Sequence, residues 1–118
     1  MTVLIRCPWP ARELSPNARC HHMVKHRAVK AYRHTCWGLA MEQSAHLRQW
    51  PAEGKITLKL TFHPPTANYP DDDNTEASFK AGRDGIAQAM GVDDARFEVT
   101  RTMGDKVKGG CVMVEVQA

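Results

Sequence analysis

The chain has 118 residues, a net charge of +3 and 42% hydrophobic residues, which predicts a single globular domain over residues 1–118. No apolar run approaches the ~18 residues of a membrane span, and the N-terminus lacks the basic segment and apolar stretch of a signal peptide. The four cysteines show no paired spacing, so we expect reduced thiols in a cytoplasmic protein with no membrane partner.

The first half of the chain predicts a strand and a long basic helix. Apolar residues alternate from Val3 to Cys7 and stop at Pro8-Trp9-Pro10, which is typical of a strand ended by proline. Apolar residues then recur at helical spacing over residues 23–48. The stripe expected to face the core is Val24, Ala28, Ala31, Tyr32, Thr35, Cys36, Leu39 and Leu47.

The second half predicts three strands and one helix. Alternation over residues 56–62 is the clearest strand pattern in the chain. A helix over residues 74–90 places Phe79, Ile86, Ala89 and Met90 inward, and its glycines Gly82 and Gly85 indicate close packing against another backbone. Strands near residues 96–103 and 111–117 are expected to form a hairpin around the basic loop 104–110. The order β-α-β-α-β-β predicts an α/β sandwich with a mixed sheet.

An acidic cluster, Asp71-Asp72-Asp73-Asn74, lies between a proline-rich loop and the second helix. Residues i and i+2 of an extended segment point to the same side, so Asp71 and Asp73 are expected to converge while Asp72 points away. The plainer interpretation is a solvated acidic turn with a helix cap. The residues that follow do not match the pattern of an EF-hand calcium loop.

A second acidic pair, Asp93-Asp94, follows the second helix. The C-terminal end of that helix, where the pair lies, is about 24 Å from Asp73 along the helix axis. The returning chain or a second subunit would therefore have to join the two groups, and a simple turn is the alternative. Lys80 is seven residues beyond Asp73 on the same predicted helix face, so its ammonium is expected to reach toward the carboxylates. An ordinary solvated lysine explains that position equally well.

Four motifs occur in order along almost the whole chain. They are Cys7-Pro8-Trp9-Pro10, Leu14-Ser15-Pro16-Asn17, Asp71-Asp72-Asp73-Asn74 and Gly91-Val92-Asp93-Asp94-Ala95-Arg96, followed by a Lys-Gly-Gly turn. No single motif is specific. Taken as an ordered set, however, they resemble the RusA-type Holliday-junction resolvases, which are small homodimeric endonucleases common in phages and prophages.

The resemblance implies a Mg²⁺-dependent endodeoxyribonuclease that cleaves branched DNA in recombination and repair, with Mn²⁺ as a substitute ion and no organic cofactor. The first two catalytic aspartates of that family match Asp71 and Asp73, and the third matches Asp94. These three are the expected metal ligands, since Mg²⁺ prefers oxygen donors and activates water. The family's lysine position holds Ala77 here, so Lys80, one turn later, is the candidate to stabilise the scissile phosphate. A homodimer would supply two sites for symmetric cleavage.

Charge is divided unevenly along the chain. Residues 1–50 carry eight Arg and Lys against two acids, whereas residues 51–118 carry eight against eleven. The basic half favours a polyanionic partner, although a solvated basic face explains it equally well. Contacts to phosphates would give affinity without reading bases. The candidate DNA-contacting residues are Asn17, Arg19, Arg27, Lys30, Arg33, Lys106 and Lys108.

Other functions fit parts of the sequence. Residues 20–26 contain Cys20, His21, His22 and His26 at ligand-like spacing, but no second pair of ligands completes a zinc site. A non-catalytic nucleic-acid-binding module would use the same basic face, with its acids only capping and turning. The loop 104–110 lacks the Gly-Lys-Ser/Thr ending of a phosphate-binding loop, which sets an NTPase aside.

The three tryptophans, Trp9, Trp37 and Trp50, are expected in the core or at an interface. Trp37 falls on the polar side of the predicted basic helix, so it is the one that base stacking would suit best.

Overall fold

The structure is a computed structural model in which residues 1–67, 69 and 73–118 are described. The chain forms one α/β domain, and its elements follow the predicted order. The strands are β1 (Thr2–Pro8), β2 (Ile56–His63), β3 (Phe97–Met103) and β4 (Cys111–Gln117). The helices are α1 (His22–Glu42), α2 (Asp73–Ser78) and α3 (Lys80–Met90), with short 3₁₀ turns η1 (Arg12–Leu14), η2 (Ala45–Leu47) and η3 (Asp94–Arg96).

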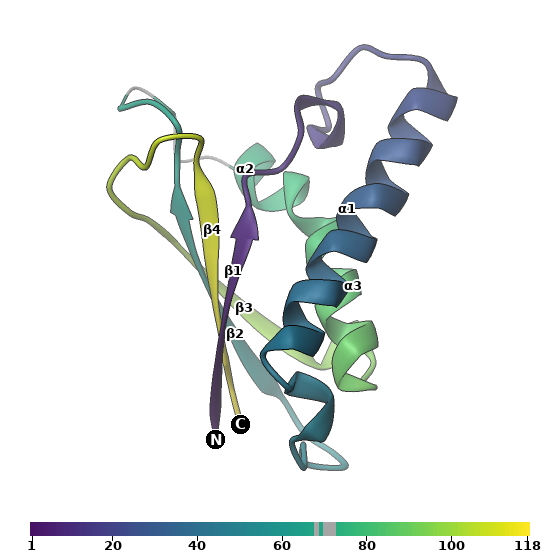
Figure 1. The fold of residues 1–118 in the computed structure, drawn as a ribbon, viewed down its shortest axis with the longest axis vertical. Coiled ribbons are helices and arrows are strands. Elements are labelled where there is room, and N and C mark those ends of the chain that lie inside the picture. Colours follow the sequence, from purple (N-terminus) through teal and green to yellow (C-terminus); the bar gives the residue numbers. More distant parts are fainter. Residues whose placement is uncertain (68, 70–72) are drawn as a thin grey trace.

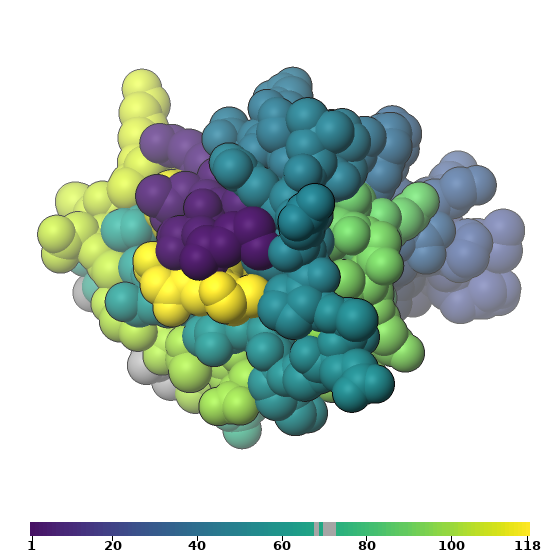
Figure 2. Space-filling view, turned by 90° about the horizontal axis from the view of Figure 1, so that it is seen from below, coloured from purple at the N-terminus to yellow at the C-terminus, as the bar shows by residue number. Residues whose placement is uncertain are grey.

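The four strands form a mixed sheet in the order β1-β4-β2-β3. Strand β4 is antiparallel to both β1 and β2, whereas β2 and β3 are parallel and are joined through α2 and α3. A parallel pair needs such a crossover, and it places α3 on the same face of the sheet as α1 (Figure 1). The two chain ends lie side by side at the bottom of the domain (Figure 2), where the Met1 amine donates to the Ala118 carbonyl over 3.1 Å.

The predicted hairpin between the last two strands is wrong, because β2 lies between them. Burial accounts for this order. Strand β4 buries most of its apolar side chains, as a central strand does, whereas β3 buries only Phe97 and carries polar residues suited to an edge. Residues 104–110 therefore cross the end of β2. They are held there by hydrogen bonds from the Gly104 N–H to the Phe62 carbonyl (2.9 Å) and from the Val107 N–H to the Pro64 carbonyl (3.0 Å).

Helix α1 is shorter than predicted, and the face that it turns toward the core is rotated about the helix axis from the predicted face. It ends at Glu42, and Ser44 then adopts left-handed backbone angles (φ 60°), so Leu47 lies outside the helix and is exposed. The buried positions are Tyr32, Cys36 and Ala40, whereas Val24, Ala31 and Thr35 of the predicted stripe are exposed. The roll follows from packing against α3, which is the most extensive helix contact of α1 among the described residues.

The close packing against another backbone that was predicted for the helix glycines is confirmed at Gly85, whereas Gly82 packs against the side-chain rings of Phe79 and Tyr32. A Cβ added to Gly85 would collide with the carbonyl oxygen of Arg33 and lie 3.0 Å from the backbone nitrogen of Trp37. A Cβ on Gly82 would lie 2.7 Å from the ring of Phe79. Only glycine at these positions lets α1 and α3 approach this closely.

The cysteines and tryptophans lie where the sequence places them. All four cysteines are free, and three of them (Cys7, Cys36 and Cys111) are buried. The three tryptophans are half-buried and pack against the core. Among the described residues, no helix combines the length and apolar character needed to cross a membrane.

We predict that Gly85→Ala destabilises the domain by about 1–3 kcal/mol, because the two helix backbones must separate to admit a methyl group. Urea unfolding measures the change. Gly38→Ala on α1 is the matched control, since nothing lies within 4 Å of its added Cβ. Alanine is favoured over glycine in a helix by roughly 0.5–1 kcal/mol, so this variant should be as stable as the wild type or more stable. Equal stability of the two variants would contradict the packing described.

Candidate functional site

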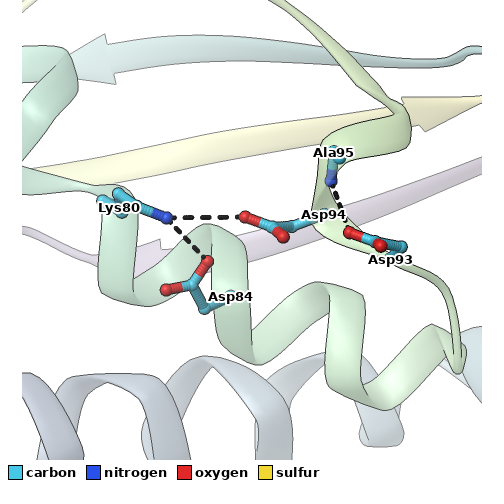
Figure 3. Close-up of polar contacts among 5 residues, drawn as sticks. All are labelled: Lys80, Asp84, Asp93, Asp94 and Ala95. Carbon is cyan, nitrogen blue, oxygen red and sulfur yellow. Dashed lines mark hydrogen bonds and ion pairs between the residues drawn. The ribbon is translucent and has the colours of Figure 1, made fainter.

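A carboxylate of the late acidic pair lies beside the start of α3. The Lys80 ammonium is 3.4 Å from Asp94 Oδ2 and 3.2 Å from Asp84 Oδ1 (Figure 3). Gly91, with φ 73°, ends α3 in the left-handed conformation, and the chain then turns back along the helix (Figure 3). Return of the same chain is therefore what brings Asp94 to Lys80, with no second subunit needed for this contact.

The two aspartates of the late pair have different partners. Asp93 Oδ1 accepts a hydrogen bond from the Ala95 N–H over 2.9 Å and caps the 3₁₀ turn η3. Asp94, the first residue of η3, instead points toward Lys80 (Figure 3). The turn expected as the plain interpretation is present, and it is Asp93 that makes it. Asp94 is left to face the lysine.

An open hollow of about 410 Å³ lies over these side chains. Its charged and polar lining consists of Arg33, Lys80, Asp84, Gln88, Asp93 and Asp94. The pKa of Asp94 is held below its usual value, first by a hydrogen bond that the Asp84 carboxyl can donate only while it is itself protonated, and then by the charges of Lys80 and Arg83, while desolvation opposes the shift. Asp94 is therefore a carboxylate at neutral pH.

Sequence reasoning missed Asp84. It lies four residues after Lys80 in α3, and side chains at i and i+4 are neighbours on a helix surface. That spacing was the signal that could have identified it. The same spacing shows why the Lys80 ammonium is held at this end of the hollow, between a carboxylate on its own helix and one on the returning chain.

Asp73, from the early acidic cluster, has a different partner. It is the first residue of α2, and its Oδ1 lies 3.2 Å from Nη1 of Arg101 on β3. The same guanidinium nitrogen is 3.8 Å from Glu76 Oε2. Arg101 was not among the candidates from the sequence. Asp71 and Asp72 lie outside the described residues, so the predicted convergence of Asp71 with Asp73 falls there as well.

The predicted single helix over residues 74–90 is two helices that meet at Phe79. All four positions predicted to face inward (Phe79, Ile86, Ala89 and Met90) are buried. The backbone at Phe79 (φ −90°, ψ 0°) ends α2 one residue before Lys80. The expectation that Lys80 shares a face with Asp73 assumed one continuous helix. With the break, Lys80 pairs with Asp84 and Asp94, and Asp73 pairs with Arg101.

The arrangement of the described carboxylates limits how a metal ion could be bound. Within residues 1–67, 69 and 73–118, no three His, Cys, Asp or Glu side chains form a group that could hold an ion. This applies to the Cys20–His26 segment too, where His21 caps α1 by accepting a hydrogen bond from the Met23 N–H. Mg²⁺, however, is usually held by one or two carboxylates together with waters and substrate phosphates. Asp84 and Asp94, two carboxylates at one open hollow, fit that donor set.

The basic side of α1 is exposed, as the sequence predicts. Its N-terminal turns project beyond the sheet (Figures 1 and 2), and Arg27, Lys30 and Arg33 are all exposed there. Arg33 differs from the other two because it also lines the hollow with Lys80 and Asp94. The remaining candidate DNA contacts are exposed in loops, and they are Asn17, Arg19, Lys106 and Lys108.

These features define an α/β-domain protein with an open, carboxylate-bearing hollow beside an exposed basic helix. No protein-family model matches the chain. Over 110 residues it is 42% identical to an uncharacterised protein of Xylella fastidiosa (strain Temecula1 / ATCC 700964), and the alignment covers 92% of this chain and 72% of that protein. The chain therefore belongs to the same family as the Xylella protein, which supplies no activity for comparison.

We predict that Lys80→Gln raises the pKa of Asp94 toward its ordinary value. The substitution removes a positive charge that stabilises the carboxylate. A ¹³C NMR titration of the Asp94 carboxyl, run downward from neutral pH, should find that the wild type keeps its charge to lower pH than the variant. Lys106→Gln, in an exposed loop, is the control and should leave the titration unchanged. A Lys80→Gln titration matching the wild type would mean that the ion pair does not form in solution.

Proposed function

We propose that the protein is a Mg²⁺-dependent endodeoxyribonuclease that cleaves branched DNA such as Holliday junctions. The observation that carries this proposal is the meeting of Lys80 and Asp94, which lie 14 residues apart in the chain, at one open hollow. Asp94 matches a catalytic aspartate of the RusA-type resolvases, whereas Lys80 is the candidate substitute for the family lysine, whose position holds Ala77 here. Their contact, together with the ordered motifs, supports a nuclease site of that kind.

Phosphodiester hydrolysis needs an activated water and stabilisation of added negative charge on the phosphate, and bound Mg²⁺ supplies both. In the proposed enzyme Asp84 and Asp94 at the hollow would hold the ion. Asp71 and Asp73 of the early cluster are the further ligands that the resemblance implies, and Asp73 is not among the residues that line this hollow. Lys80 binds the scissile phosphate. Its side chain is 59% exposed, so a phosphate can reach the ammonium from the hollow. Arg33 offers a second cation to the same phosphate or its neighbour.

The pair between Asp73 and Arg101 is compatible with this role. The Asp73 side chain is fully exposed, and an ion pair in solvent contributes little to stability. A metal ion and a DNA phosphate can therefore take over the two partners without disturbing the fold.

The substrate and assembly follow from the distribution of charge. The projecting turns of α1 present Arg27 and Lys30 to a DNA backbone, while Arg33 lies between that surface and the hollow. A four-way junction has two strands to cut symmetrically. We therefore propose a cytoplasmic homodimer whose twofold axis supplies two such sites.

A non-catalytic nucleic-acid-binding module is the second candidate. It is favoured by one observation, namely that the three described aspartates of the proposed site, Asp73, Asp84 and Asp94, are already paired with basic side chains. These ion pairs would be the whole role of the acids if the acids only stabilised turns and held no metal ion. The two candidates differ in whether DNA is cut.

We predict that Asp94→Asn and Asp73→Asn each reduce cleavage at least about 10²-fold, by analogy with loss of one group that stabilises a transition state. Binding of the junction should persist, because the DNA-contacting cations are unchanged. The assay uses labelled four-way junction, fork and linear duplex, with and without Mg²⁺ or Mn²⁺. Asp93→Asn is the matched control, since asparagine also caps, and it should retain most activity. Tight binding by the wild type without cleavage of any of these DNAs would favour the binding module instead.

The second prediction here concerns the basic helix. Each neutralised phosphate makes the slope of log K against log[salt] steeper by about 0.9 for duplex arms. The double variant Arg27→Ala/Lys30→Ala should therefore flatten the slope by about 1.8 per engaged protomer, on the same rule. Arg33 is left intact because it also lines the hollow. The control is Arg6→Ala/Lys59→Ala, on the sheet face opposite the helices, which should keep the wild-type slope. An identical slope in the α1 variant would show that this surface is merely solvated.

A further inference from the structure

A second hollow, of about 370 Å³, lies between the segment that follows β1 and helix α2. Its side walls include Trp9, Arg12, Ser15, Tyr69, Thr75 and Ser78, and we call it the aromatic slot. The ring centroids of Trp9 and Tyr69 are 5.0 Å apart, and the ring planes lie at 82°. Two aromatic rings, hydroxyl groups and one guanidinium thus surround a space open to solvent.

The two rings of the slot differ in how firmly they are held. Trp9 packs edge-on against the buried ring of Phe62, with centroids 6.1 Å apart. A Cβ added to Gly110 would lie 2.9 Å from the Cβ of Trp9, so the backbone also presses on its base. Tyr69, in contrast, is 41% exposed. One ring is therefore anchored in the core while the other presents accessible aromatic surface, which is the construction of a stacking platform.

The slot adjoins loops that carry candidate DNA contacts. It shares Arg12 with a hollow whose lining includes Asn17 and Arg19. It shares Tyr69 with another hollow, whose lining includes Lys106. Two acids, Glu13 and Asp105, also line those hollows, and the three cations outnumber them.

The slot is also connected to the Lys80 site. Ser78 lines both the slot and a further hollow, and that hollow is lined by Lys80 and Asp84 as well. Lys80 and Asp84 in turn line the hollow at Asp94. The three hollows are therefore neighbours on the surface, and a strand whose phosphate lies at Lys80 would pass next to the aromatic rings.

We infer that the aromatic slot binds one unpaired nucleobase of the DNA, stacked on Tyr69 against the Trp9 wall. The phosphates of the same strand then lie along Arg12 and Arg19. This inference rests on the proposed function, because it names the single-stranded feature of the same substrate. The two serine hydroxyls of the slot are already engaged, since the Ser78 hydroxyl donates to the Asn74 carbonyl (2.7 Å) and the Ser15 hydroxyl accepts from the Asn17 N–H (3.3 Å). Stacking therefore dominates, and stacking tolerates any base.

The test measures binding of a forked DNA with two single-stranded thymidine arms, in metal-free buffer, by fluorescence anisotropy. Tyr69→Ala should weaken binding about 5- to 150-fold, the range expected for loss of one stacked base. Tyr69→Phe keeps the ring and should stay within about two-fold of the wild type, on the same reasoning. Leu47→Ala, at another exposed apolar side chain, is the control and should have no effect. Thermal unfolding verifies that each variant is folded.

A second measurement locates the base. Abasic nucleotides are placed one at a time along the single-stranded arm next to the branch. One position should weaken binding by the wild type and have no further effect on Tyr69→Ala, because the same stacking contact is removed by either change. Additive losses at every position, or unchanged affinity of Tyr69→Ala, would overturn the slot. A changed oligomeric state with unchanged DNA affinity would also overturn it and assign the slot to contact between copies of the chain.

The outcomes separate this inference from the proposed function. If the wild type cleaves with Mg²⁺ and Tyr69→Ala binds the fork as tightly as the wild type, base stacking in the slot is overturned and the proposed nuclease activity stands. Binding that couples Tyr69 to one base, without cleavage at any metal concentration, supports the slot and overturns the nuclease. Failure of the wild type to bind the fork overturns both.

Discussion

The contact of Gly85 with the backbone of α1 is the constraint on which the rest of the arrangement depends. Because a glycine of α3 lies directly against the Arg33 carbonyl, the two helices lie close together on one face of the sheet. This proximity rolls α1 so that Tyr32, Cys36 and Ala40 enter the core. It also places the Arg33 side chain over the start of α3, where Lys80 stands. The absence of a side chain at Gly85 therefore affects both the packing of the helices and the position of Arg33 at the charged hollow.

The charged hollow is built from short ion pairs that remain accessible to solvent. Lys80 lies between Asp84 and Asp94, and more than a third of the Asp94 side chain is exposed. Exposed pairs of this kind add little to folding stability. Their value lies in arranging charge where an anion and a cation can both reach it. The aromatic slot, which is separated from this hollow by the one that Ser78, Lys80 and Asp84 line, adds a surface that suits a base rather than a phosphate.

Much of the fold could be predicted from local patterns. Alternation in β1 and β2 identified their buried faces, because side chains on successive strand residues point to opposite sides. The close packing of Gly82 and Gly85 was also predictable, since glycine inside a helix is unfavourable unless a neighbour requires it. Of the candidate site, the sequence identified Lys80 and Asp94. It missed Asp84 and Arg101, whose contacts depend on which partners the fold supplies.

The sequence by itself determined the identity and order of the strands and helices, because periodic burial is a local property of each segment. Only the tertiary structure decided the strand order β1-β4-β2-β3. The Gly-Gly sequence between β3 and β4 is typical of a turn, but it does not indicate that β2 lies between these two strands in the sheet. The structure also shows a break at Phe79, which the helical pattern of residues 74–90 did not indicate because Phe79 faces inward in either arrangement. The pairing of Lys80 with Asp94 depended on that break and on the return of the chain after Gly91. Both belong to the packing of α3 beside α1 on one face of the sheet.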